Sequence, residues 1–305
     1  MNTDSEADTF NSRSSPPAGL LVPSPSSLVR VDVAALSDQG KVRSNNEDHY
    51  WVTCFGRSLE TLMTNLPEGL VPGRIEEIGY VMLVADGMGG MAAGEVASRL
   101  AISTLVDLVL STPDWIMRIG EPEVEEVMRR IAERFSRVNA VLIEQATRDP
   151  RLAGMGTTMT LAFSLGADLF IAHVGDSRLY LLRQGALHKL TRDHTMAQQL
   201  MDAGLGPPQG VGVERFQHIL TQALGAEKVP FKPQVQHLLL ADGDQLLLCT
   251  DGLTDMVNDA AIAAVLQEKL SATEACQALV DLALHHGGRD NVTVAVGRYS
   301  IPPLP

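Results

Sequence analysis

The sequence has few cysteines and no long apolar run. Its three cysteines, Cys54, Cys249 and Cys276, are widely spaced and form no Cys-x-x-Cys pair. They indicate buried thiols in a reducing compartment rather than disulfides or a zinc site. No segment approaches the roughly 20 apolar residues that a membrane-spanning helix needs, and residues 1–15 lack the apolar core of a secretory signal. We therefore expect a soluble, cytoplasmic protein without a membrane span.

Basic residues are also scarce relative to acidic ones. Lysine and arginine number 24 against 37 aspartates and glutamates, which gives a formal net charge of −13. Because nucleic-acid backbones favour clustered lysine and arginine, this balance argues against nucleic acid as a partner. Hydrophobic residues make up 45% of the chain, which is typical of a globular protein.

The composition changes sharply near Val29. Residues 1–28 are rich in serine and proline and indicate a disordered tail, whereas residues 29–300 have the patterns of a folded domain. Within that domain, residues 54–78 look like an insertion between two strands. Residues 195–229 are glycine-rich and mixed, with a short helix near Met196–Ala203 and an irregular loop, and long irregular segments in compact domains are often functional.

Strand-length apolar runs and helical periodicities follow one another through the domain. Strands are predicted at 29–36, 49–53, 78–85, 245–250 and 292–299, helices at about 123–146, 259–269 and 272–286, and a β-rich antiparallel meander at 157–190. Strands that pair with strands, with helices clustered outside them, indicate an α+β fold with layered sheets.

Acidic residues stand at the ends of four predicted strands. The pairs are Glu47-Asp48, Asp86-Gly87, Asp251-Gly252 and Asp290-Asn291. Mg²⁺ and Mn²⁺ prefer such oxygen ligands, and glycine lets the backbone carbonyl come close. A lone Asp-Gly is usually a turn, so spacing alone leaves both a turn and a metal site open.

Eight segments that include these residues resemble, in order, the signature motifs of the metal-dependent type 2C Ser/Thr protein phosphatases, and especially of the bacterial branch. They are SDQGKVRSNNED (37–48), VADGMGGMAAGEVAS (84–98), GMGTT (154–158), AHVGDSRLY (172–180), LTRDHT (190–195), LTQALG (220–225), LLCTDGLTD (247–255) and GGRDNVTV (287–294). The resemblance spans about 31–299. It implies a four-layer α-β-β-α sandwich, with two central antiparallel sheets flanked by helices, and a catalytic domain over 29–300 whose flap lies at about 195–219.

The resemblance also assigns roles to individual residues. It implies two Mn²⁺ or Mg²⁺ ions, with a possible third, and the metal ligands Glu47, Asp48, Asp86, the Gly87 carbonyl, Asp176, Asp251 and Asp290. Asp86 would bridge both ions and be catalytic, and Glu47 and Asp48 would bind directly or through water. Asp176 would hold the third ion together with Asp251, or would instead cap a turn at Ser177 or Arg178. Arg43 would be catalytic and bind the substrate phosphate, because its planar fork can contact two phosphate oxygens.

One position departs from the family. Many eukaryotic members carry a histidine two residues after the bridging aspartate, where this chain has Met88. Methionine cannot protonate the leaving alkoxide, so another group must do so. His194 is the remaining motif histidine, and we favour a structural role for it at a turn. His173, on an apolar strand, is predicted to be a core residue.

The resemblance implies direct hydrolysis of phosphoserine and phosphothreonine in proteins by a metal-bridging hydroxide, without a phosphoenzyme. It also implies a monomer that opposes a bacterial Ser/Thr kinase. The alternative is a pseudophosphatase that serves as a binding module, but such a protein would have lost metal ligands. No cysteine begins a Cys-x5-Arg loop, and the DxD within 241–245 is predicted to be a turn.

Overall fold

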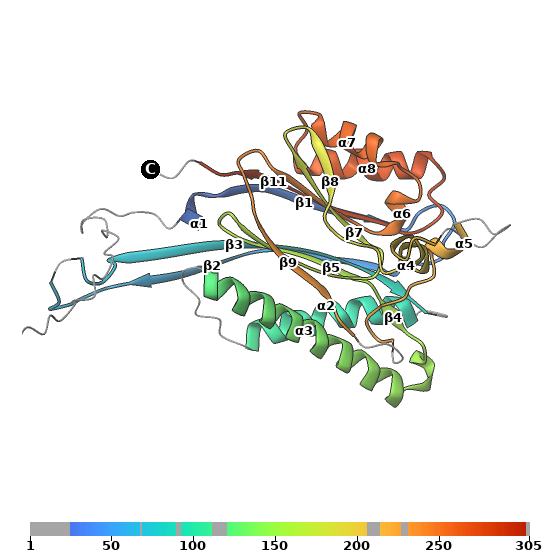
Figure 1. The fold of residues 1–305 in the computed structure, drawn as a ribbon, viewed down its shortest axis with the longest axis horizontal. Helices are drawn as coiled ribbons and strands as arrows, with labels where there is room; N and C mark the ends of the chain where they lie inside the picture. The colour runs from blue at the N-terminus through green and yellow to red at the C-terminus, as the bar shows by residue number, and fades with distance from the viewer. Residues whose placement is uncertain are drawn as a thin grey trace, which may run out of the picture.

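The computed structural model describes residues 25–67, 69–89, 93–111, 121–205, 214–226 and 231–302. The chain forms two stacked antiparallel sheets with helices on both outer faces (Figure 1). This arrangement confirms the predicted α-β-β-α sandwich. Within the described residues, no helix combines the length and the apolar character needed to cross a bilayer.

The first sheet contains the strands that lead to Asp86 and Asp176. Its order is β2 (Asp48–Glu60), β3 (Arg74–Met88), β5 (Met159–Leu165), β6 (Asp168–Val174) and β9 (Gln234–Leu239), and the short β4 (Gly156–Thr157) pairs with the end of β3. Helices α2 (Ala93–Ser111) and α3 (Glu121–Arg148) cover its outer face (Figure 1).

The second sheet contains the strands that lead to Asp251 and Asp290. Its order is β1 (Arg30–Asp38), β11 (Val292–Ser300), β10 (Gln245–Cys249), β7 (Arg178–Arg183) and β8 (Ala186–Lys189). Helices α7 (Asp259–Gln267) and α8 (Ala272–His285) cover its outer face. Helix α8 begins with a capping box between Ser271 and Glu274, which satisfies two backbone N–H groups at the helix start.

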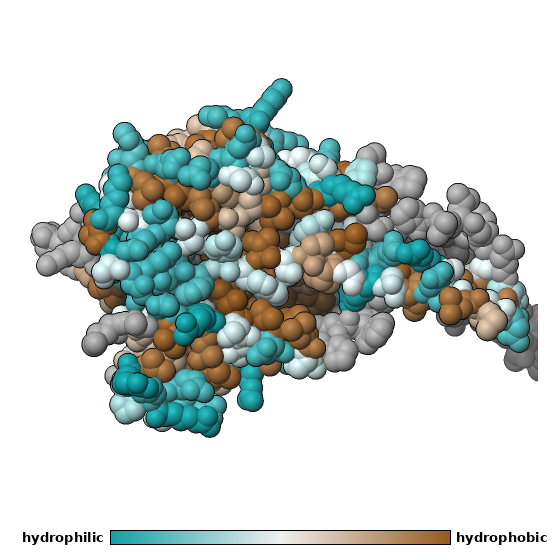
Figure 2. Space-filling view, turned by 180° about the vertical axis from the view of Figure 1, so that it is seen from behind, coloured by the Kyte–Doolittle hydropathy of each residue, from teal (hydrophilic) through white to brown (hydrophobic). Residues whose placement is uncertain are grey.

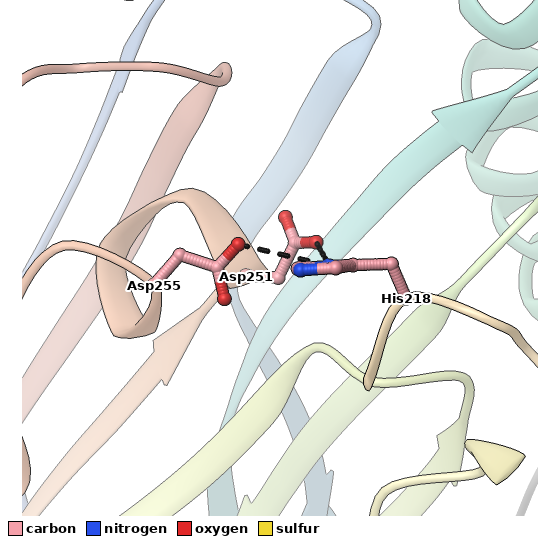
Figure 3. A group of neighbouring side chains, drawn as sticks. All are labelled: His218, Asp251 and Asp255. Carbon is pink, nitrogen blue, oxygen red and sulfur yellow. Dashed lines mark ion pairs between the residues drawn. The ribbon is translucent and has the colours of Figure 1, made fainter. Parts of the chain in front are cut away.

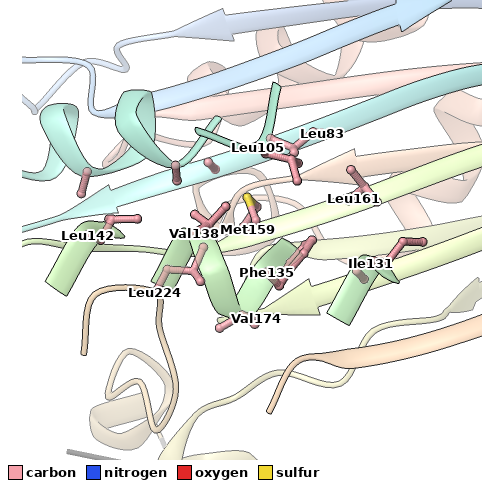
Figure 4. Packing of buried hydrophobic residues seen from close by; sticks show 14 of the residues in the cluster. Leu83, Leu105, Ile131, Phe135, Val138, Leu142, Met159, Leu161, Val174 and Leu224 are labelled. Atoms are coloured by element: carbon pink, nitrogen blue, oxygen red, sulfur yellow. The ribbon is translucent and has the colours of Figure 1, made fainter. Parts of the chain in front are cut away.

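The apolar face of helix α3, which its spacing predicts, packs against the first sheet. Ile131, Phe135, Val138 and Leu142 recur at helical spacing and are buried against the first sheet (Figure 4). A separate apolar layer, which includes Val84, Ile171 and Leu248, fills the space between the two sheets. Because both faces of each sheet are covered, the central strands read as continuous apolar runs.

The predicted insertion at 54–78 is only partly correct, because residues 61–73 lie between strands whereas 54–60 and 74–78 belong to β2 and β3. Strands β2 and β3 pair continuously from Asp48–Asp86 to Glu60–Arg74, so most of that segment belongs to a long hairpin that projects beyond the helices (Figure 1). The hairpin leaves the layered core, and its side chains therefore lose the apolar alternation that marks a half-buried strand. Figure 2 shows the opposite face of the molecule, with the hairpin on the right and apolar and polar residues mixed on the surface.

The predicted meander at 157–190 is only partly correct. Strands β5 and β6 pair with each other, and so do β7 and β8, but the first pair lies in one sheet and the second pair in the other. The chain crosses between the sheets at residues 175–177. Gly175 has a φ of 110°, and a Cβ atom there would lie 2.6 Å from the Cβ of Thr158, so the crossing requires glycine.

Two smaller predictions are also corrected. Residues 1–24 of the predicted tail lie outside the described residues, but Pro25–Leu28 form helix α1, with Ser26 buried against Gly166. Cys249 and Cys276 are buried free thiols as predicted, whereas Cys54 is exposed because it lies in the hairpin. The remaining short helices are η1 (Pro150–Leu152), α4 (Met196–Asp202), α5 (Glu214–Gln217) and α6 (Asp251–Thr254).

Candidate metal centre

Asp48 and Asp86 are brought together by strand pairing. They are directly opposite each other in the β2–β3 ladder, at the end of the hairpin that lies inside the molecule. In antiparallel sheets the Cα atoms of such a pair lie about 4.5–5.5 Å apart. The backbone N–H of Asp86 donates to Thr158 Oγ1, and its carbonyl accepts from Thr157 Oγ1. Asp86 is therefore fixed by both neighbours of its strand.

The second sheet delivers Asp251 to the same place. Strand β10 ends at Cys249, and helix α6 then begins with Asp251. Thr250, between them, donates its hydroxyl to Asp48 Oδ2 at 2.8 Å. This buried hydrogen bond joins the two sheets at the point where their aspartates converge.

The side chain of Asn291 holds the loop that carries Arg43 and Glu47. Its Oδ1 accepts from the backbone N–H of Glu47 at 2.9 Å, and its Nδ2 donates to the carbonyls of Gln39 and Asn45, each at 2.8 Å. The preceding residue, Asp290, accepts from Arg43 Nη2 at 2.6 Å. Asp290, Arg43 and Glu47 are thus placed by one asparagine.

Gly87 allows helix α2 to approach this centre. A Cβ atom at Gly87 would overlap the carbonyl oxygen of Gly94 in the first turn of the helix. A Cβ atom at Gly94 would in turn lie 2.7 Å from Glu47 Oε2. Ser98 donates its hydroxyl to the Glu47 carbonyl at 2.6 Å. The two glycines therefore let the first turn of α2 pack against both the Gly87 backbone and the Glu47 side chain.

Asp176 lies in the crossing between β6 and β7. Its neighbour Ser177 is hydrogen-bonded through Oγ to Thr158 Oγ1 at 2.7 Å, and Thr158 also bonds the Asp86 backbone. Arg178 forms its ion pair with Asp193, at 2.8 Å, rather than with Asp176. Asp176 lines the same cavity as Asp86 and Asp251.

Burial and mutual repulsion raise the pKa values of Asp48, Asp86 and Asp176. Burial, reinforced by the charges of Asp251 and Asp290, raises the pKa of Asp48 to about 7. Burial and the neighbouring Asp251 raise the pKa of Asp176 to about 8. The pKa of Asp86 is raised well above its usual value by burial and by Asp48. Such a group of acids is unfavourable unless protons or cations neutralise it.

Two oxygen atoms indicate that cations, rather than protons alone, fit this centre. Oδ1 of Asp48 and Oδ1 of Asp251 are buried without a hydrogen-bond partner. Buried acceptors are nearly always hydrogen-bonded, so each unpaired oxygen calls for an explanation. Unpaired carboxylate oxygens from two sheets, beside a glycine carbonyl, are the ligand set that Mg²⁺ and Mn²⁺ prefer.

Sequence reasoning missed two residues next to Asp251. His218 Nδ1 lies 3.9 Å from Asp251 Oδ2 and 3.7 Å from Asp255 Oδ2 (Figure 3). These distances are those of ion pairs rather than hydrogen bonds, and the three ligand atoms lie within 4.8 Å of one another. Asp251 foremost raises the pKa of His218 to about 9, and burial raises that of Asp255 to about 6.

Only one of these two residues had a sequence signal. Asp255 stands four residues after Asp251 in LLCTDGLTD, and that spacing places both side chains on one side of a helical turn. His218 follows residues 206–213, which lie outside the described residues, and no periodicity in its neighbourhood points to Asp251.

The converging residues line an open cavity of about 1330 Å³. Among the predicted site residues, Arg43, Glu47, Asp86, Gly87, Asp176, Asp251 and Asp290 line it, and so do Met88 and His218. Asp48 lies behind this surface and is buried. The described part of segment 195–219 borders the cavity through α4 and through Gln217, His218 and Ile219.

The two histidines within the motifs, His173 and His194, are structural, as predicted. His173 is fully buried, and its Nδ1 is 2.8 Å from Thr160 Oγ1. His194 accepts a hydrogen bond at Nδ1 from the backbone N–H of Gly175, and its ring stacks on His173 with the centroids 5.0 Å apart. His194 therefore supports the crossing between the sheets and does not line the cavity.

Comparisons with known proteins agree with this geometry. The profile of the family described as protein phosphatase 2C matches residues 74–285. Serine/threonine protein phosphatase PstP of Mycobacterium tuberculosis is 35% identical over 263 residues, which cover 86% of this chain and 44% of PstP. Protein phosphatase PhpP of Streptococcus pneumoniae is 30% identical over 276 residues, which cover 87% of this chain and 96% of PhpP. The chain therefore spans less than half of PstP but nearly all of PhpP.

Solved structures show the same fold. The catalytic domain of PstP, in complex with two manganese ions, matches with a TM-score of 0.69 and 34% identity over 89% of this chain and 99% of that chain. A serine/threonine phosphatase of S. agalactiae matches with a TM-score of 0.69 and 31% identity over 88% of this chain and 99% of that chain.

Proposed function

Because this chain belongs to the protein phosphatase 2C family, we propose that it hydrolyses phosphoserine and phosphothreonine in proteins with the help of two Mn²⁺ or Mg²⁺ ions. The observation that carries the proposal is the pair of buried, unpartnered oxygens, Asp48 Oδ1 and Asp251 Oδ1, at the junction of the two sheets. A cation site explains them, whereas a purely structural cluster of acids leaves them unexplained.

In this proposal the residues of the centre hold the cations. Asp86, Asp251, Asp290 and the Gly87 carbonyl would hold the cations, with Glu47 and Asp48 acting directly or through water. Bound cations would lower the pKa of a water molecule, so that hydroxide attacks phosphorus directly and no phosphoenzyme forms. Asn291 holds the backbone of Glu47 and Thr250 holds the Asp48 carboxylate through hydrogen bonds before substrate arrives.

Arg43 is proposed to bind the substrate phosphate. Its Nη2 is engaged by Asp290, but a guanidinium has five N–H donors in one plane. The remaining donors can contact two phosphate oxygens and offset the charge that develops on them. The Asp290 contact fixes the side chain, which is otherwise half-exposed at the cavity.

We also propose a third cation, held by Asp176 and Asp251. Asp255 and His218 lie beside Asp251 (Figure 3), and both are available to the same ion. Neither Met88 nor His194 serves as the proton donor to the leaving alkoxide, because methionine has no proton to give and His194 is engaged with Gly175.

The cellular setting is proposed from the relatives. PstP and PhpP are bacterial protein phosphatases by name, and we propose that this chain acts as a cytoplasmic monomer on phosphoproteins made by a bacterial Ser/Thr kinase. We further propose that residues 29–300 form the catalytic domain and that segment 195–219 is a flap over its active site.

The test is hydrolysis of p-nitrophenyl phosphate and of a phosphothreonine peptide by the full chain, with Mn²⁺, with Mg²⁺ and with EDTA. We expect turnover only with the metal ions. Asp86→Asn and Asp251→Asn should each reduce kcat by at least about 100-fold, while circular dichroism stays unchanged. The matched control is Asp107→Asn, which alters an exposed aspartate on helix α2.

Two results would decide against the proposal. Turnover by Asp251→Asn close to that of the unaltered chain would contradict the metal assignment. Binding of Mn²⁺ and of phosphopeptide without any turnover would favour the pseudophosphatase alternative.

A further inference from the structure

Four arginine and lysine side chains of the described residues line the cavity, and three of them are paired with acids. Arg43 contacts Asp290 at 2.6 Å, and Asp193 accepts from Arg178 at 2.8 Å and from Lys189 at 3.2 Å. Arg289 also lines the cavity, but no carboxylate of the described residues lies within 4.0 Å of its guanidinium. Its cationic group is exposed and available to a ligand.

The backbone below Arg289 is held firmly although its side chain is exposed. Gly287 and Gly288 adopt φ values of 133° and 52°, which favour glycine. The carbonyl of Gly288 accepts from the backbone N–H of Lys41 at 2.7 Å. A Cβ atom at Gly40 would lie 2.9 Å from that same carbonyl oxygen. The turn is thus packed tightly against the loop that carries Arg43, so Arg289 starts from a fixed position.

The side chain of Lys41 lies behind this turn. Lys41 Cγ is 3.4 Å from the Cβ position of Gly288, and the lysine is exposed, with no acid within 4.0 Å among the described residues. We call Lys41, Arg43 and Arg289 the basic rim. The chain as a whole carries a net charge of −13, and the acids of the metal centre lie close to Arg43. Lys41 and Arg289 are the two cations of the basic rim that have no carboxylate of the described residues within 4.0 Å.

The basic rim includes Arg43, the proposed phosphate ligand, and therefore borders the place where substrate would bind. Arg43 is the proposed phosphate ligand, and Arg289 precedes Asp290, the acid that binds Arg43. Because Arg43 and Arg289 line the same cavity, a phosphopeptide whose phosphate reaches Arg43 can place a neighbouring residue near Arg289. Complementary charge at the edge of a binding site selects among partners and speeds their association.

We propose that Arg289 binds an anionic group next to the phosphorylated residue of the substrate, so that the enzyme prefers acidic phosphopeptides. This inference rests on the proposed function. The group is a carboxylate or a second phosphate, which share the chemistry that a guanidinium recognises. Arg289 is then a specificity residue, and the metal centre carries out the hydrolysis.

The test compares four phosphothreonine peptides that differ only in the flanking residues. These residues are glutamates, alanines, lysines or one phosphoserine with alanines. The readout is kcat/KM for each peptide, expressed relative to the alanine peptide for the same protein. The full chain with Mn²⁺ is compared with Arg289→Glu, with Arg289→Gln and with the control Arg137→Glu, which makes the same charge change at an exposed arginine of helix α3.

We expect the unaltered chain to prefer the glutamate or the phosphoserine peptide over the alanine peptide. The ratio of kcat/KM for these two anionic peptides shows whether a carboxylate or a second phosphate is favoured. Arg289→Glu should lower that preference by about 3- to 10-fold, mainly through KM, and should raise the relative activity on the lysine peptide. Arg137→Glu should leave the preference unchanged. The preference should also weaken between about 50 and about 500 mM NaCl, because the contact is solvent-exposed.

The inference is overturned if the relative activities are the same in the unaltered chain and in Arg289→Glu, or if Arg137→Glu changes them equally. Failure of the proposed function has a different signature. In that case the unaltered chain would not hydrolyse p-nitrophenyl phosphate with any of the metal ions.

Discussion

Asp48 and Asp86 lie directly opposite each other on antiparallel neighbours, and no cationic side chain is hydrogen-bonded to either among the described residues. Like charges directly opposite in a ladder are destabilising. The strand register therefore imposes a repulsion between these two acids. Any cation that binds both would remove it.

The first prediction concerns stability without metal. Because the pKa of Asp48 in the folded state is about 7, against an ordinary value near 4, the folded protein loses stability as the pH rises from about 4 to about 7. The loss is up to about 4 kcal/mol for this group. We expect metal-free protein to unfold at lower urea concentration at pH 8 than at pH 5.5, and Mn²⁺ to restore stability at pH 8.

Asp48→Asn provides the control for that experiment. It removes the titrating group, so the difference between pH 5.5 and pH 8 should shrink. Equal stability of the metal-free unaltered chain at the two pH values would contradict the raised pKa.

The second prediction concerns Arg43. Replacement by alanine removes the fork that is proposed to hold the phosphate, and we expect KM for phosphopeptides to rise about 10-fold, with a smaller change in kcat. Arg43→Lys should recover only part of the loss, because a lysine gives a point charge in place of two parallel donors. Steady-state kinetics with saturating Mn²⁺ measure both effects. A loss confined to kcat would instead place Arg43 in transition-state stabilisation alone.

The third prediction concerns His218. With a pKa of about 9, this histidine is protonated at pH 8 when no metal is bound. A cation at Asp251 should drive that proton off, because a metal ligand must be neutral and a cation repels imidazolium. Calorimetric titration with Mn²⁺ in two buffers that differ in ionisation enthalpy should show about one proton fewer released by His218→Ala than by the unaltered chain. His188→Ala, at an exposed position of β8, is the control, and identical proton release in all three proteins would exclude the effect.

The fourth prediction concerns the backbone beneath Asp251. A Cβ atom at Gly252 would overlap the carbonyl oxygen of Asn291, and that carbonyl belongs to the residue that organises Glu47 and Asp290. Gly252→Ala should destabilise the protein by about 1–3 kcal/mol and weaken Mn²⁺ binding. Gly73→Ala is the matched control, since no atom lies within 4 Å of its Cβ position. Equal urea midpoints for the two variants would show that α6 can shift at no cost.

Local features of the fold could be read from the sequence because they depend on neighbouring residues. The apolar face of Ile131, Phe135 and Val138 specifies α3 by its spacing, and the apolar run that precedes Asp86 specifies the core part of β3. Similarly, the eight motifs indicated both the family and the residues of the cavity. The hairpin was misjudged because polar residues such as Arg57 and Glu77 occupy the partly buried face of its outer half, so the alternation in burial is not an alternation of apolar residues.

By itself, the sequence determined which residues carry carboxylate oxygens, which segments of the core fold as helices or strands, and to which family the chain belongs. Only the tertiary structure decided that Asp48 faces Asp86, that Thr250 bonds Asp48 across 202 positions, and that His218 approaches Asp251. The reason is physical. Strand register and burial arise from pairing between distant segments, and the pKa of a carboxyl group depends on the water and the charges that the completed fold leaves around it.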